Sequence, residues 1–160
     1  MRDNIVESPY GAGIFVNDRE TGSHNEIANN VLQENGAHQF TGAITMEEVS
    51  DAEVHQNTVQ GQGSGGFALR LEGGPHTRAV QITDNIFVGS PVNMLYVTER
   101  AQAVFVADRN FYHAKQPRFH WGTQEYSFAG WQKVSRQDSH SQVADPALFE
   151  PPQISPGTPN

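Results

Sequence analysis

The chain has 160 residues, 36 % of them apolar and 15 of them glycine, with a formal net charge of −8, which fits one globular domain able to bury a core. No cluster of Lys and Arg is present, which argues against a nucleic-acid backbone as partner, and no apolar run approaches membrane-spanning length. The absence of cysteine excludes disulfide bonds and thiolate metal sites.

An Asn followed by apolar or β-branched residues recurs along the chain every 25 to 28 residues. The positions are Asn4, Asn30, Asn57, Asn85 and Asn110. A fixed period of this length indicates a solenoid, in which each repeat stacks on the next. Because Asn tolerates the left-handed backbone conformation of a bend and has an amide side chain, we predict an Asn ladder along one corner of the coils.

Short segments with strand-like alternation precede most of these Asn residues and follow every one of them. Those before it lie at 26–27, 53–54, 80–82 and 104–106, and those after it at 13–16, 43–46, 68–71, 94–97 and 118–121. Three short strands per repeat predict an all-β fold, a right-handed parallel β-helix of about five coils over residues 1–126. The segment from Val106 to Asn110 is one residue longer than that from Ile82 to Asn85, which predicts a bulge near Asp108-Arg109.

Aligning the strands that follow the Asn bends predicts columns of side chains that run from coil to coil. Two columns face the core: Ile14, Ile44, Leu69, Leu95 and Phe119, and then Val16, Met46, Leu71, Val97 and Trp121. Two columns face outward: Phe15, Thr45, Arg70, Tyr96 and His120, and beside them Asn17, Glu47, Glu72, Thr98 and Gly122.

The two ends of the solenoid differ in the sequence. Residues 127–149 predict a C-terminal cap, with a short helix from Ser127 to Val134 that places Phe128, Trp131 and Val134 on one face. We expect residues 146–149 to close the last coil and the proline-rich residues 150–160 to form a disordered tail. At the other end only three residues precede Asn4, so the first coil lacks its preceding strand, and we expect another copy or a partner domain to cover it.

Four segments near the C-terminus carry a family resemblance: residues 108–112 (DRNFY), 126–132 (YSFAGWQ), 137–141 (QDSHS) and 144–149 (ADPALF). Together with the repeat, they make the chain resemble the pectate-lyase-like superfamily of parallel β-helix proteins, and in particular the C-terminal region of secreted bacterial members. The resemblance implies an extracellular location and a polysaccharide groove on the sheet that follows the Asn bends. It does not imply one activity, because the superfamily includes lyases, hydrolases, epimerases, tailspikes and adhesins.

The outward column is therefore the candidate substrate-binding site: Phe15, Thr45, Arg70, Tyr96 and His120. If the chain is a polysaccharide lyase, Arg70, Tyr96 or His120 transfers the proton; if it is a glycoside hydrolase, the carboxylates of Glu47 and Glu72 are the reacting pair, at about the 5–5.5 Å separation of retaining enzymes. In the alternative interpretation Arg70 only neutralises glutamates on a solvated face. A second functional hypothesis is a structural or adhesive solenoid that assembles through its N-terminal end.

Three further patterns bear on cofactor sites, and none predicts one. The acids Glu47, Glu48, Asp51 and Glu53 offer oxygen ligands for Ca²⁺ but lack the spacing of a calcium loop. Residues 61–66 match GxGxxG but precede a strand instead of a helix. The seven histidines lack zinc-motif spacing, so we predict no metal.

Overall fold

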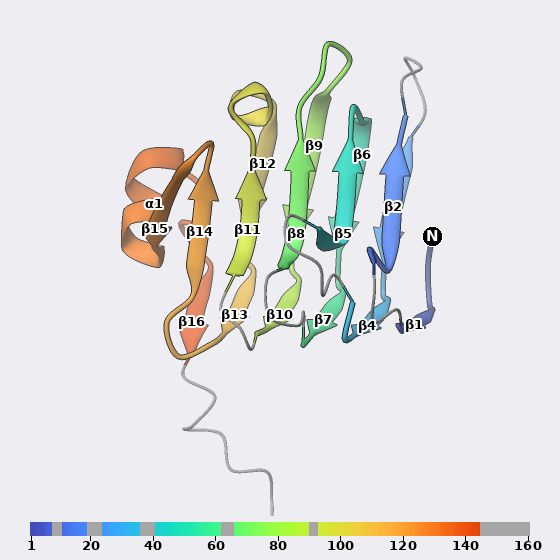
Figure 1. Ribbon diagram of the computed structural model, residues 1–160, viewed down its shortest axis with the longest axis horizontal. Coiled ribbons are helices and arrows are strands. Elements are labelled where there is room, and N and C mark those ends of the chain that lie inside the picture. The colour runs from blue at the N-terminus through green and yellow to red at the C-terminus, as the bar shows by residue number, and fades with distance from the viewer. Residues whose placement is uncertain (8–10, 19–23, 36–40, 62–65, 90–92, 145–160) are drawn as a thin grey trace, which may run out of the picture.

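The computed structural model describes residues 1–7, 11–18, 24–35, 41–61, 66–89 and 93–144. It is an all-β solenoid in which three parallel sheets wind around one core (Figure 1). In that view the chain rises through the front sheet, descends through the rear sheet and returns through the lower sheet while advancing from right to left, which is a right-handed coil. The predicted fold class is confirmed, with about four full turns where five coils were expected.

Each coil contributes one strand to each sheet. The front sheet contains β2 (Ile14–Asn17), β5 (Gly42–Glu47), β8 (Phe67–Glu72), β11 (Asn93–Val97), β14 (Arg118–Trp121) and β15 (Gln124–Ser127). The rear sheet contains β3 (Asn25–Ala28), β6 (Ser50–His55), β9 (Arg78–Thr83) and β12 (Phe105–Asp108). The lower sheet contains β1 (Ile5–Glu7), β4 (Val31–Gln33), β7 (Thr58–Gln60), β10 (Ile86–Val88), β13 (Phe111–His113) and β16 (Gln142–Ala144). A 3₁₀ turn, η1 (Glu99–Ala101), follows β11.

The core is a stack of aliphatic and aromatic side chains along the solenoid axis. Both predicted inward columns of the front sheet pair in register from coil to coil, as from Ile44 to Leu69 and from Met46 to Leu71. Their central members are fully buried, and only Val16 and Trp121, at the two ends, are partly exposed. Since each strand has only three to six residues, its stability comes from this stacking and from the ladders on both sides.

The predicted Asn ladder is present at the corner between the rear and lower sheets. Each side-chain oxygen accepts two hydrogen bonds from the preceding Asn: Asn57 Oδ1 lies 3.0 Å from Asn30 N and 2.9 Å from Asn30 Nδ2. The same pair of bonds links Asn4 to Asn30, Asn57 to Asn85 and Asn85 to Asn110. The ladder is buried except at its N-terminal end, where Asn4 is partly exposed.

The backbone conformation at this corner differs from the prediction in one respect. The left-handed residue is the one before each Asn, with φ between 54° and 58° at Asp3, Asn29, Gln56, Asp84 and Arg109. The ladder Asn itself is not left-handed. The bend therefore has a short or polar residue that reverses the chain and then an Asn whose amide is directed inward along the stack.

The predicted bulge near Asp108-Arg109 is wrong. Strand β12 pairs with β9 without a break, with Ala107 opposite Ile82, so the alignment of Val106 with Ile82 was off by one residue. An irregularity occurs instead at the start of the front strands, between Asn93 and Leu95. There, two consecutive residues face the core in each of three coils: Ala43-Ile44, Ala68-Leu69 and Met94-Leu95.

The C-terminal end is capped by β15 and the helix α1 (Phe128–Ser135). Strand β15 pairs antiparallel with β14, and the Ser127 hydroxyl caps the helix by accepting from Gly130 N. Trp131 is fully buried, whereas Val134, predicted on the same face, is 37 % exposed. Spacing by threes drifts around a helix of 3.6 residues per turn, so the buried face continues to Ser135 and Val134 turns outward.

A buried carboxylate joins this cap to the coils. Asp138 is fully buried, and its oxygens accept from Asn110 Nδ2, the Tyr112 hydroxyl, Trp131 Nε1 and the Ser141 hydroxyl. Burial and the nearby Asp138 charge raise the pKa of Tyr112 well above its usual value, so the phenol remains a donor. Asp138 and Ser141 thus take the place of the next Asn in the ladder.

The N-terminal end has strand edges and apolar side chains on its surface. Strands β1, β2 and β3 are the edge strands of the three sheets within the described residues. Ile5 is 77 % exposed and Phe15 is 57 % exposed. The expected closing segment 146–149, the tail 150–160 and most of the GxGxxG segment lie outside the described residues. Among the described helices, none is long and apolar enough to span a bilayer.

Candidate functional site

The outward column of the front sheet forms as a continuous line of side chains. Phe15 pairs with Thr45, Thr45 with Arg70, Arg70 with Tyr96 and Tyr96 with His120, each in register on the next coil. The second column likewise aligns Asn17, Glu47 and Glu72. All of these residues therefore lie on the face that the sequence alignment predicts.

The members of this column are not equally available to a ligand. Thr45 is only 4 % exposed, and its hydroxyl accepts from Gly42 N at 3.0 Å. Phe15 is well exposed but lies on the other side of Thr45 from Arg70. The structure thus brings together Arg70, Tyr96 and His120, and it separates Phe15 from them.

An aromatic cluster surrounds these three residues. The Phe67 ring lies 5.0 Å from both the Tyr96 ring and the His120 ring, and the Tyr96 and His120 rings are 5.8 Å apart. The Arg70 guanidinium lies 5.5 Å from the centre of the Tyr96 ring. Phe67 was missed from the sequence, because simple alternation places it inward. The run Phe67-Ala68-Leu69 carries the signal that could have identified it. Ala68 and Leu69 both face the core, so the residue before them faces outward.

Two polar atoms of the cluster are buried without a hydrogen-bond partner in the described part of the chain, Arg70 Nε and His120 Nε2. Arg70 Nη2 forms an ion pair with Glu72 Oε1, and His120 Nε2 lies 3.6 Å from Glu125 Oε2. Buried polar atoms are nearly always hydrogen-bonded in folded proteins. These two atoms are therefore the groups on this face whose hydrogen-bonding capacity is least satisfied.

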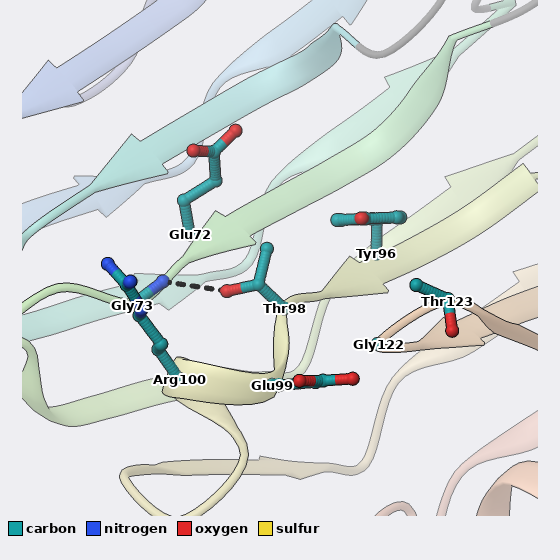
Figure 2. A pocket seen from close by; sticks show the side chains of 8 residues that line it. All are labelled: Glu72, Gly73, Tyr96, Thr98, Glu99, Arg100, Gly122 and Thr123. Atoms are coloured by element: carbon teal, nitrogen blue, oxygen red, sulfur yellow. Dashed lines mark hydrogen bonds between the residues drawn. The ribbon is translucent and has the colours of Figure 1, made fainter.

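A hollow of about 360 Å³ adjoins the cluster where the front strands end (Figure 2). Tyr96 and Thr98 extend from β11 and its end, Glu72 comes from β8, and Glu99 and Arg100 come from η1. It is also lined by Gly73, Gly122 and Thr123, and Gly73 N donates to Thr98 Oγ1 at 2.9 Å. The hollow combines one aromatic ring, hydroxyls, two carboxylates and one guanidinium.

Gly122 keeps this hollow open. Its φ of +62° is in the left-handed region, and a Cβ there would fall 2.9 Å from Glu99 Cγ. The sequence places Gly122 in the second outward column but does not identify Glu99, Arg100 or Thr123. Those residues lie in turns, where strand periodicity gives no signal.

Burial gives His120 a distinct protonation state. Burial lowers its pKa below the ordinary 6.5, outweighing the opposing attraction of the Glu125 carboxylate. His120 therefore holds a proton less readily than an ordinary histidine. Arg118 nearby acts in the same direction as burial.

This shift predicts how stability depends on pH. The unfolded chain, with the ordinary pKa, binds more protons than the folded chain between pH 6.5 and the lower folded-state pKa. The contribution of His120 to stability is thus fully present above pH 6.5 and declines as the pH falls below it. Urea unfolding at pH 5, 6, 7 and 8 should show a smaller loss toward acid in His120→Gln than in the wild type. Equal pH dependence in the two proteins would contradict the shift.

The glutamates of the second column are engaged by neighbours. Asn17 Nδ2 donates to Glu47 at 3.0 Å, and Arg70 pairs with Glu72. The pairing of Arg70 and Glu72 agrees with the alternative in which Arg70 neutralises a glutamate on this face. Whether Glu47 and Glu72 react as a pair remains a prediction.

The four acids considered for Ca²⁺ do not gather among the described residues. Glu47 is bound to Asn17, Asp51 lies 3.8 Å from Arg78 across the rear corner, and Glu53 faces Glu26. A different group does converge on the rear sheet: Glu26, Glu53 and His55, whose ligand atoms all lie within 4.8 Å of one another.

Comparisons with protein families, with curated proteins and with solved structures found no match to this chain. The architecture is therefore established by the structure alone as a parallel β-solenoid with an Asn ladder. Membership of the pectate-lyase-like superfamily stays a prediction that depends on the repeat and the C-terminal motifs.

Proposed function

We propose that the chain is a polysaccharide-binding β-solenoid module of a larger extracellular protein, with its binding face on β8, β11 and β14. The binding groups are the rings of Tyr96 and His120, the guanidinium of Arg70 and the hollow beside them. The observation that supports this proposal is the packing of these rings around two buried, unsatisfied polar atoms, Arg70 Nε and His120 Nε2, next to a hollow that Tyr96 lines.

Sugars match the chemistry of this face. An aromatic ring with a polar tip packs against the C–H face of a pyranose, while charged side chains and hydroxyls bind its hydroxyl groups. Coils repeat about every 4.8 Å, so equivalent side chains lie in a line along which a linear polymer extends. Arg70 and Arg100 would bind carboxylates of an acidic polymer, and Glu72 and Glu99 would bind hydroxyls.

If the module also acts on its ligand, a neutral His120 is the group best placed to take a proton, with Tyr96 beside it as a second proton carrier. That assignment retains the three candidates Arg70, Tyr96 and His120 and distinguishes a lyase from a binding module. A glycoside hydrolase would instead depend on Glu47 and Glu72. Release of unsaturated ends indicates the first, and release of reducing ends indicates the second.

A second function is favoured by the exposed apolar residues at the N-terminal end. Ile5 and Phe15 are the most exposed large hydrophobic side chains among the described residues, and they lie on or beside the edge strands β1 and β2. A solenoid with such an end gains stability when a second copy covers it, because free strand edges then pair. In this case the chain is a structural or adhesive element.

A panel of neutral and uronate polysaccharides tests the proposal, scored for binding by affinity electrophoresis and for release of chain ends. We expect at least one polymer to bind, and Arg70→Ala/Tyr96→Ala to weaken that binding about tenfold or more, since each lost stacking or charge contact is worth on the order of 1 kcal/mol. Phe15→Ala, a ring change elsewhere on the same sheet, is the matched control and should bind normally.

Two outcomes oppose the proposal. Unchanged binding in the double variant would remove the site from β8 and β11. A chain that binds no polymer, but sediments as an oligomer that Ile5→Asp dissociates, would favour the structural function.

A further inference from the structure

The rear sheet carries a cluster that the proposed function does not use. Glu26 on β3 and Glu53 on β6 are opposite each other in register, and His55 is two residues beyond Glu53 on the same face. One ligand atom from each residue lies within 4.8 Å of the other two. All three residues are partly buried, so the atoms are held by the sheet yet accessible to a small ion.

The two carboxylates of this cluster favour the binding of a cation. Two glutamates directly opposite on neighbouring strands repel each other. The Arg2 guanidinium partly compensates them, with Nε 2.6 Å from one Glu26 oxygen and Nη2 bonded to the other. It keeps the pKa of Glu26 below its ordinary value. Glu53, by contrast, has neither an ion pair nor a hydrogen bond from its side chain within the described ranges.

The contacts of His55 also support a cation site. Its Nδ1 lies 3.3 Å from Gln56 Oε1, and its Nε2 lies 3.1 Å from Glu26 Oε1. Without a metal, a proton on Nε2 satisfies its contact with the Glu26 carboxylate. A divalent ion bound between His55, Glu26 and Glu53 would take the place of that proton. A ligating His is typically held in this way, by an oxygen acceptor at its other nitrogen.

We propose that Glu26, Glu53 and His55 form a binding site for a divalent metal ion of the zinc class, with Arg2 as the competing cation. One imidazole nitrogen and two carboxylates suit Zn²⁺ and its transition-metal neighbours, with water in the remaining position. Ca²⁺ fits less well, because it takes six to eight oxygen ligands. The site is on a different sheet from the proposed polysaccharide face and does not depend on it.

Calorimetric titration of the 160-residue chain with ZnCl₂ tests the site, with Co²⁺ absorption as a report on coordination. We expect one equivalent to bind, and Glu53→Gln or His55→Ala to weaken it about tenfold or more. Arg2→Ala should tighten binding about thirtyfold, because the repulsion between one positive charge and a divalent ion at roughly 4 Å in water is worth about 2 kcal/mol.

His140→Ala is the matched control, because His140 Nδ1 also contacts a rear-sheet carboxylate, 2.7 Å from Asp108, but with only one acid. It should leave zinc affinity unchanged. Absence of zinc binding in the wild type, equal affinity in Glu53→Gln and His55→Ala, or a loss caused equally by His140→Ala would each overturn the proposal. Because Glu53 has no partner to lose among the described residues, Glu53→Gln should stay folded and keep the test valid.

Discussion

Replacing Asn57 with alanine should lower the free energy of unfolding by about 3–5 kcal/mol. The substitution removes the acceptor of two Asn30 donors and the donor to Ile27 O, all of them within the solenoid. Each buried polar group left without a partner costs about 1–3 kcal/mol. Urea or guanidinium unfolding followed by far-ultraviolet circular dichroism measures the change.

Asn4→Ala is the matched control for this effect. Asn4 Nδ2 donates to Asn30 Oδ1 as Asn57 Nδ2 donates to Asn85 Oδ1, but Asn4 is partly exposed at the end of the ladder, and water replaces the bond that its side chain loses. We expect a loss of under about 1 kcal/mol. Equal losses at Asn4 and Asn57 would show that the ladder is a local bend preference and not a buried network.

Replacing Asp138 with asparagine should lower the free energy of unfolding by about 3 kcal/mol or more. The cap should unfold before the coils. The amide keeps the size of the side chain but removes its charge and one acceptor, so that either Trp131 Nε1 or the Tyr112 hydroxyl loses its bond. Hydrogen bonds to charged groups contribute about 1.5–3 kcal/mol each. Unfolding followed by tryptophan fluorescence reports on Trp121 and Trp131, whose rings pack 5.5 Å apart between the last coil and the cap.

Asp84→Asn provides the comparison. The Asp84 carboxylate pairs with Arg109 at 2.8 Å on the surface, where such pairs contribute about 0–1 kcal/mol. We expect Asp138→Asn to be the more damaging change by a clear margin. If the two variants are equally stable, Asp138 does not join the cap to the coils.

The repeat was predictable because one residue type marks every coil. Asn30, Asn57 and Asn85 each precede a lower-sheet strand, and the lower-sheet strands pair at the spacing of these Asn residues, as Val31 with Thr58 and Thr58 with Ile86. The front-sheet strands were aligned from their own alternating apolar pattern. In the rear sheet, the apolar pattern aligned Val106 with Ile82, and this was wrong. The left-handed residue that follows each rear strand, Arg109 here, fixes the register and aligns Ala107 with Ile82. The Asn therefore determines the register of the strand on each side of it, since the rear-sheet partners Val54 and Ile82 are separated by the same number of residues as Asn57 and Asn85.

The candidate sites depended on features that a periodic pattern does not carry. Arg70, Tyr96 and His120 share a column and were found, whereas Phe67 depends on an irregularity and Glu99 on a turn. The cluster on the rear sheet escaped because its glutamates are one coil apart, 27 residues, and not at the spacing of a metal motif. In a solenoid, residues separated by one period are neighbours, so ligand sets should be sought at that spacing.

The measurement that most directly tests the proposed function is a backbone amide NMR titration with oligomers of whichever polysaccharide binds. We expect shifts concentrated at residues 70–73, 96–100 and 120–123, around the aromatic cluster and the hollow. Shifts confined to the rear sheet or to β1 and β2, or no shifts with any polymer of the panel, would contradict the proposed binding face.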